Sequence, residues 1–173
     1  MDSGRAAPRV GALGPHHRGR VAEILGATGA FTASEIDVAL ELFDSAIRST
    51  ESYELIGVFD GAGALRGYAC WGPTPGTDRG YDLYWIAVDP AAHGRGWGST
   101  LMRAVEDRLR ERDARLLVVE TSSRSSYGTT RLFYERRGYV ERARVRGFYA
   151  EGDDRVIFTK KLKAGAGEEA RHE

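Results

Sequence analysis

Cysteine is almost absent from this 173-residue sequence, which contains only Cys70. A single thiol excludes an intramolecular disulfide framework and a cysteine-rich metal site. The adjacent histidines His16 and His17 have no partner residues at metal-ligand spacing, so we expect no bound metal. Asparagine is missing altogether, so any role of an asparagine side chain in binding would have to be taken by another residue.

Long apolar runs are also missing, since none approaches the roughly 20 residues that a membrane-spanning helix needs. The N-terminal residues Met1–Pro8 have no apolar core, so we do not expect a secretory signal. Neither sign of charge is in excess, because 25 Lys and Arg residues balance 25 Asp and Glu residues. The sequence therefore predicts a cytoplasmic protein with neither a nucleic-acid nor a membrane partner.

The composition and length are those of one soluble domain, with 42% hydrophobic and 29% charged residues. We expect this domain to cover residues 9–162. A flexible N-terminus is expected at 1–8. Alternating Ala and Gly followed by charged residues predict a disordered tail at 163–173.

The apolar pattern predicts an alternation of strands and helices. Helices are expected around Val21–Leu25, after Thr32, after the glycine-rich loop described next, and at Ser125–Arg137. Strands are expected at Val10–Leu13, Tyr53–Phe59, Leu65–Trp71, Tyr81–Val88, Arg115–Glu120, Tyr139–Val145 and Arg155–Lys160, the last two joined by a turn at Phe148–Asp154. This order indicates an α/β (α+β-type) fold, and its hairpins indicate a mixed sheet.

Three alternating glycines, Gly94, Gly96 and Gly98, stand between an apolar strand and an amphipathic helix. Glycine lets a ligand approach the backbone, and the following helix directs its free N–H groups and positive dipole end toward the loop. Such an arrangement favours phosphate. The loop lacks the lysine of a Walker motif, and Ser99 stands where a dinucleotide fingerprint needs its last glycine. A tight strand-to-helix turn without a ligand is the alternative interpretation.

The segment from His93 through Gly96 to Gly98 resembles the acyl-CoA pyrophosphate loop of the GNAT superfamily of N-acetyltransferases. His93 stands where that family usually has Arg or Gln. A second segment, Arg131–Tyr139, resembles the family helix that ends Phe-Tyr-x-x-x-Gly-Phe/Tyr. The order of elements agrees from about Arg9 to Lys161. The resemblance implies a central mixed, mostly antiparallel β-sheet flanked by helices on both faces.

The resemblance also implies that acetyl-CoA is the acyl donor and that an amine attacks its thioester directly. The backbone of Ile86–Val88 would then pair with the pantetheine arm, while the loop N–H groups would hold the pyrophosphate. The expected cofactor-binding residues are Ile86, Ala87, Val88, His93, Gly94, Arg95, Gly96, Trp97, Gly98, Ser99 and Tyr134. Many relatives hold the cofactor with an asparagine, for which Ser126 or Thr130 would have to substitute here.

Three residues are candidates for catalysis. Tyr134 matches the family tyrosine beside the CoA sulfur, where a phenol can protonate the departing thiolate; packing on a helix is the alternative. Asp82 lies where many relatives carry a carboxylate that acts through water. Glu120 ends an apolar strand, where α/β proteins often bind ligands. Both carboxylates could instead be ordinary strand-end charges, and ordered water without a dedicated base is a further alternative.

The sequence thus predicts an acetyl-CoA-dependent N-acetyltransferase acting on a primary amine of a small molecule, amino acid or peptide. Two alternatives stay open. One is a non-catalytic CoA-sensing or partner-binding domain on the same fold, since fold alone does not establish activity. The other is a protein N-terminal acetyltransferase. The expected state is a monomer or a homodimer.

Overall fold

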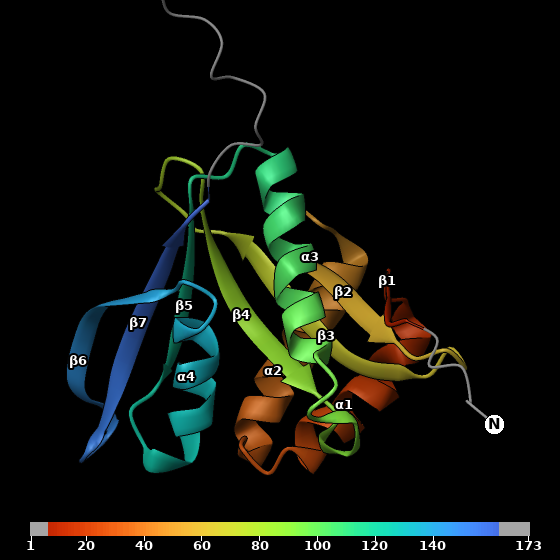
Figure 1. Ribbon diagram of the computed structural model, residues 1–173, viewed down its shortest axis with the longest axis horizontal. Helices are drawn as coiled ribbons and strands as arrows, with labels where there is room; N and C mark the ends of the chain where they lie inside the picture. Colours follow the sequence, from red (N-terminus) through yellow and green to blue (C-terminus); the bar gives the residue numbers. More distant parts are fainter. Residues whose placement is uncertain (1–6, 163–173) are drawn as a thin grey trace, which may run out of the picture. The chain divides into compact units, whose positions relative to one another are not determined.

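The computed structural model describes residues 7–162 and is shown in Figure 1. The predicted flexible N-terminus therefore falls mostly outside the described residues, and the predicted tail at 163–173 falls wholly outside them. In chain order the elements are β1 (Arg9–Gly11), η1 (Pro15–His17), α1 (Arg18–Ala27), α2 (Ala33–Arg48), β2 (Glu54–Phe59), β3 (Leu65–Pro73), β4 (Gly80–Val88), η2 (Pro90–Ala92), α3 (Trp97–Glu111), β5 (Leu116–Ser122), η3 (Ser125–Tyr127), α4 (Gly128–Glu135), β6 (Val140–Ala150) and β7 (Asp153–Lys161).

The seven strands follow the hydrogen-bonded order β1-β2-β3-β4-β5-β7-β6. β4 and β5 pair in parallel, whereas β1 with β2, β2 with β3, β5 with β7 and β6 with β7 are antiparallel. The expected mixed, mostly antiparallel sheet is confirmed. The described residues divide into two compact units, the first made of residues 7–72 and 84–107 and the second of residues 73–83 and 108–162. The start of β4 belongs to the second unit and its end to the first.

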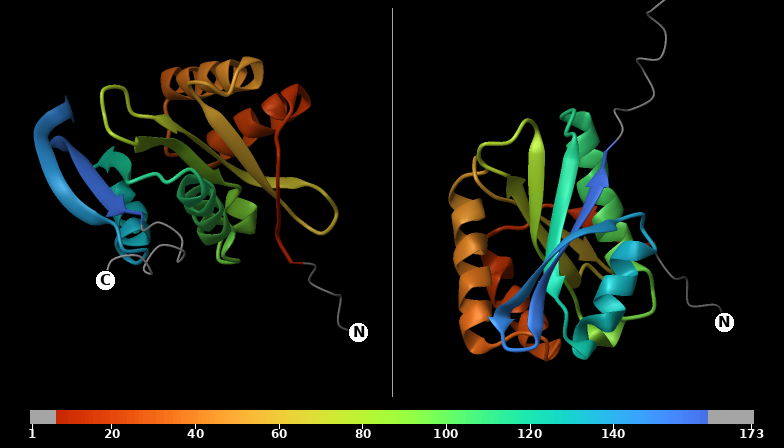
Figure 2. Two further views of the ribbon diagram at one scale, coloured as in Figure 1. Left: turned by 90° about the horizontal axis from the view of Figure 1, so that it is seen from above. Right: turned by 90° about the vertical axis from the view of Figure 1, so that its left-hand side faces the viewer.

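In the first unit, α1 and α2 lie on one face of the strands and α3 lies on the other (Figure 2). Side chains alternate along β3, so Tyr68 and Cys70 join the buried cluster that includes residues of α1 and α2. Gly67 faces the other way, since a Cβ there would meet the Leu101 side chain of α3 at 3.2 Å and the Ala87 carbonyl oxygen at 2.8 Å. Helices on both faces were expected, and this expectation is confirmed.

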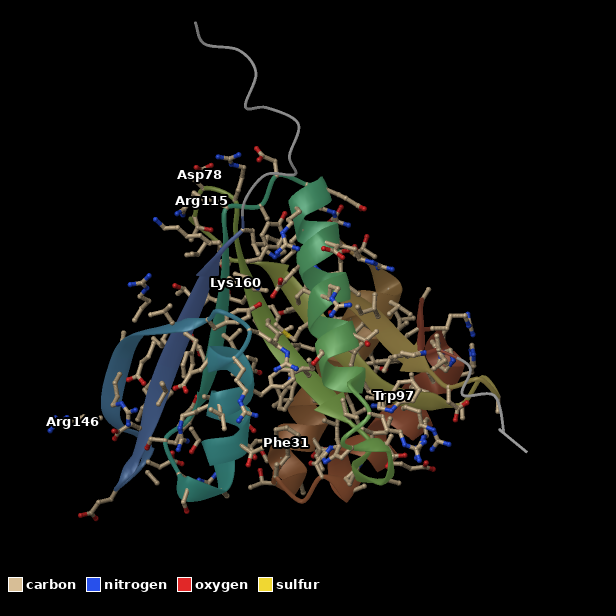
Figure 3. All side chains as sticks on the ribbon, viewed as in Figure 1. Phe31, Asp78, Trp97, Arg115, Arg146 and Lys160 are labelled. Atoms are coloured by element: carbon tan, nitrogen blue, oxygen red, sulfur yellow. The ribbon has the colours of Figure 1, made fainter. Side chains whose placement is uncertain are left out.

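The beginning of α2 follows from its local sequence. The Thr32 hydroxyl accepts the Glu35 N–H at 3.2 Å, and the Glu35 carboxylate accepts the Thr32 N–H at 2.7 Å. This reciprocal pairing is a capping box, and it starts the helix that was predicted to follow Thr32. Phe31, labelled in Figure 3, precedes the cap and packs edge-on against Trp85 of β4, with 5.1 Å between ring centroids.

In the second unit, α4 covers one face of β5 and β7. Tyr134 of α4 lies 6.1 Å from the Phe158 ring of β7, and Phe158 pairs with Val119 of β5. Because neighbours across strands share a face, Leu117 and Val119 also face α4, whereas Glu120 and Arg155 face the other way. Gly138 ends the helical segment with φ +82°, directly after the predicted end of the helix at Arg137.

The β6–β7 turn differs from the expected one. β6 continues to Ala150 and β7 begins at Asp153, so the turn is confined to Glu151 and Gly152 rather than spread over 148–154. The strand was predicted to end at Val145, but it continues through an irregularity at Gly147, where φ is +59° and the N–H donates to the Asp154 carboxylate at 2.9 Å. The aromatic residues that follow favour extended backbone and carry the strand onward.

Among residues 7–162, no helix is both long and apolar enough to cross a membrane.

Candidate functional site

The glycine loop lies between β4 and α3, within the first unit. Gly94 and Gly96 have φ of +75° and +76°, in the left-handed region that other residues rarely adopt. A Cβ added at either position would meet no atom within 4 Å. The backbone conformation, rather than crowding by the protein, therefore explains these two glycines, and the space beside them is open.

The beginning of α3 follows the loop directly. Its first turn contains no acidic residue, and Gly98 and Ser99 lie in it. Trp97, labelled in Figure 3, opens the helix with a side chain that is only 7% exposed. Its indole Nε1 has no hydrogen-bond partner within the described part of the chain. Because the indole is buried, the Trp97 side chain contributes no polar group to the surface.

His93 and Arg95 are the two charged or titratable side chains of the loop, and both are exposed. A ring nitrogen of His93 lies 3.1 Å from the carbonyl oxygen of Val88. This contact ties the loop back to the end of β4. Ala87 is buried in the core, whereas Ile86 and Val88 are half-buried.

The second unit brings the two candidate carboxylates together. Asp82 pairs with Val118 in register, and Glu120 lies two residues further along β5 on the same face. The Thr74 hydroxyl donates to Asp82 at 2.7 Å. Partial burial raises the pKa of Asp82 above its ordinary value, and the negative charge of Glu120 adds to the rise, while Thr74 and Arg155 oppose it.

Arg155 of β7 is the cationic partner on this face. Its guanidinium forms an ion pair with Glu120 and lies 4.8 Å from the centroid of the Phe148 ring. Tyr149 of β6 lies beside the group; burial raises its pKa, with a further contribution from the charge of Glu120. The face of the second unit that carries Asp82 and Glu120 thus combines two carboxylates, one guanidinium and two half-exposed aromatic rings.

Tyr134 belongs to α4, which covers the opposite face of β5 and β7. It is 4% exposed. Its ring packs edge-on against Phe133 and Tyr139, with centroid distances of 5.4 and 5.7 Å. Burial raises the pKa of its phenol well above the ordinary value, so the hydroxyl keeps its proton at neutral pH. It can therefore act as a proton donor but not as a base.

Several residues that surround the two carboxylates were not predicted from the sequence. Thr74 lies in the loop after β3 and Arg155 lies 35 residues beyond Glu120, so only the fold brings them to the two carboxylates. The hydroxyl candidates for the missing asparagine lie in neighbouring elements: Ser126 is exposed in η3, and Thr130 is half-buried in α4. Residues 7–162 contain no group of three or more His, Cys, Asp or Glu side chains that could hold a metal ion.

Comparison with known proteins gives the family. The model of the acetyltransferase (GNAT) domain matches residues 52–141. A solved structure from Desulfovibrio desulfuricans, assigned to the GNAT family of acetyltransferases, is 38% identical and has a TM-score of 0.84. The match covers 91% of this chain and 99% of that one. The chain belongs to the GNAT acetyltransferase family.

More distant acetyltransferase structures share the fold. The ribosomal-protein-S18-alanine N-acetyltransferase of Escherichia coli is 22% identical with a TM-score of 0.74, covering 96% of this chain and all of that one. A Salmonella typhimurium protein, solved with its cofactor acetyl-CoA, is 18% identical with a TM-score of 0.71 over 96% of this chain and 100% of that one. No curated protein matched the chain.

Proposed function

We propose that this GNAT protein transfers the acetyl group of acetyl-CoA to a primary amine of a small molecule, an amino acid or a peptide. The observation that carries the proposal is the open backbone at Gly94 and Gly96, directly before a helix whose first turn has no acidic residue. Such a helix start attracts an anion, and the pyrophosphate of CoA is one. Family membership and the acetyl-CoA in the Salmonella typhimurium structure support the choice of donor.

For the donor, the backbone N–H groups of Gly94–Ser99 would hold the pyrophosphate, and the backbone of Ile86–Val88 would pair with the pantetheine arm. The His93 side chain would brace the loop through Val88. When bound, acetyl-CoA supplies the activated acetyl group as a thioester.

For the acceptor, we assign proton removal to Asp82. A free alkylamine, with a pKa of roughly 10, is mostly protonated at neutral pH and must lose a proton before it attacks. The raised pKa of Asp82 suits a base, whereas Glu120 is held by Arg155. Glu120 would orient the incoming ammonium group and is the alternative base.

The amine begins as an ammonium ion and loses two protons overall. The first would pass through water to Asp82, which would release it to solvent, and the neutral amine nitrogen would then form a bond to the thioester carbonyl carbon. The nitrogen would lose its second proton to water as the carbon–sulfur bond breaks, and the departing sulfur would take a proton from the Tyr134 hydroxyl, which solvent would restore. Both Asp82 and Tyr134 would thus return to their starting protonation states, with one proton released for each acetyl group transferred.

Calorimetry with acetyl-CoA tests the donor site. The wild-type protein should show saturable binding, and Gly96→Asp should lose affinity by about tenfold or more, because a carboxylate then opposes the pyrophosphate. Gly63→Asp is the matched control, since Gly63 also has positive φ (+83°) and open space but lies in the β2–β3 turn. Absence of wild-type binding at millimolar acetyl-CoA would contradict the proposal.

The single domain at 9–162, the cytoplasmic location and the monomeric or homodimeric state remain predictions.

A further inference from the structure

Asp89 is a buried carboxylate at the point where β4 gives way to the glycine loop, and it is 7% exposed. One carboxylate oxygen accepts the N–H of Ala91 at 3.0 Å and so caps η2. The other oxygen accepts hydrogen bonds from two guanidinium groups, those of Arg20 in α1 and Arg66 in β3.

Both arginines are themselves anchored. The Nε of Arg20 donates to the carbonyl oxygen of Leu65 at 3.2 Å, and the Nε of Arg66 donates to Asp60 at 2.8 Å. The backbone N–H of Asp89 also donates to the carbonyl oxygen of Arg66 at 2.7 Å. Side chain and main chain therefore fasten one residue to a helix and to a neighbouring strand.

The surroundings of Asp89 favour the charged form of its carboxylate. Burial alone would raise the pKa of Asp89, but the Ala91 N–H and the two guanidinium groups outweigh it and lower the pKa. Removing the charge of Asp89 would take from each arginine its most buried carboxylate partner, leaving Arg20 with Glu23 and Arg66 with Asp60. The ionised carboxylate thus adds to the Asp89 N–H bond in holding this residue against α1 and β3.

Four residues separate Asp89 from Gly94, where the open part of the loop begins. A loop of glycines loses much conformational entropy when it closes on a ligand, and a fixed starting point reduces that loss. We infer that Asp89, held by Arg20 and Arg66, is a positioning residue for the pyrophosphate-binding loop and sets affinity for that part of the cofactor. This inference rests on the proposed function, and it assigns Asp89 no contact with the cofactor.

Asp89→Asn is the variant that tests this inference. Asparagine keeps the size of the side chain and an oxygen for the Ala91 N–H, but it loses the charge that holds both arginines. Arg20→Gln removes only one of the two cationic partners, so it should give a smaller effect in the same direction. Asp44→Asn is the control, because Asp44 pairs with Arg18 of α1 at 2.8 Å without touching the loop.

The readouts separate positioning from general loss of structure. For Asp89→Asn we expect the Kd for CoA to rise about tenfold, as for a misplaced binding loop. We expect kcat at saturating acetyl-CoA, and kcat/KM for acetyl-pantetheine, which lacks the pyrophosphate, to stay within about twofold of wild type. Asp44→Asn should leave the Kd for CoA unchanged.

Two results would overturn the inference. One is an unchanged Kd for CoA in both Asp89→Asn and Arg20→Gln. The other is an equal loss with CoA and with acetyl-pantetheine, which a structural role alone would produce. Failure of the wild-type protein to bind CoA would instead overturn the proposed function, and the positioning role with it, so the two failures are distinguishable.

Discussion

The hydroxyl of Thr74 donates a hydrogen bond to the carboxylate of Asp82 over 2.7 Å. The donor comes from the loop after β3 and the acceptor from the third residue of β4. A hydrogen bond to a carboxylate favours its charged form, whereas burial and the charge of Glu120 disfavour it. The opposing effects act on one titrating group, so their removal should shift its pKa in opposite directions.

The pH dependence of kcat/KM should therefore move in opposite directions in two variants. Activity needs the Asp82 carboxylate, so it should fall as pH drops through the raised pKa of Asp82. Thr74→Val removes the stabilising hydrogen bond and should move this acidic limb to higher pH. Glu120→Gln removes a repelling charge and frees Arg155, which should move the limb to lower pH. The measurement is the pH profile of thiol release with a fixed amine.

Thr77→Val is the control for these profiles, because its hydroxyl donates to the Thr74 carbonyl oxygen and not to Asp82. Its acidic limb should coincide with that of the wild type. Loss of nearly all activity in Glu120→Gln, with a normal profile in Asp82→Asn, would assign the base to Glu120 instead.

Tyr134→Phe should lower kcat by about 100-fold, the smaller end of what a general acid contributes. The ring contacts to Phe133 and Tyr139 survive this substitution, so the midpoint of thermal unfolding should change little. The Kd for acetyl-CoA should also stay close to that of the wild type. A full kcat in this variant would leave Tyr134 with a packing role only.

Asp60 should make the free energy of unfolding depend on pH in the acidic range. Its pKa is lowered from 3.8, first by the Ala64 N–H and next by the Arg66 guanidinium. Because the folded pKa lies below the unfolded one, the contribution is present above about pH 4 and is lost as pH falls through the folded pKa. Urea unfolding at pH 7 should show Asp60→Asn to be less stable than wild type, and the difference should shrink toward pH 3. A difference that grows on acidification would contradict the sign.

Thr32→Ala should reduce the free energy of unfolding by about 1 kcal/mol, the usual cost of losing a side-chain N-cap. Both bonds of the capping box would be affected, because Glu35 would lose its hydroxyl partner. Ser34→Ala, an exposed change within the same turn, serves as the control. Equal stability of the two variants in urea unfolding would show that the cap is unimportant.

Features set by neighbours in the chain were predictable from the sequence. The cap at Thr32 depends on spacing within one turn, and the stop at Gly138 depends on a residue that tolerates positive φ. The mixed sheet and its helices follow from apolar periodicity and the two family motifs. The prediction of a turn at 148–154 was wrong, because Gly147 bends the strand without ending it.

Features that depend on tertiary contacts were not predictable in this way. The contact between Arg20 and Asp89 spans 69 positions, and that between Glu120 and Arg155 spans 35. No periodicity links residues so far apart. One local signal was available at Asp89, because an aspartate directly before a proline is typical of a helix cap.

N-acetyl transfer by this protein is tested most directly by an assay of the full chain with acetyl-CoA and a panel of primary amines. Thiol release would be followed over time, and mass spectrometry would identify the acetylated product. We expect saturable thiol release matched by formation of an N-acetyl amide, which hydroxylamine does not cleave. Tight binding of acetyl-CoA without turnover on any amine, or an acetyl ester as the product, would contradict this expectation.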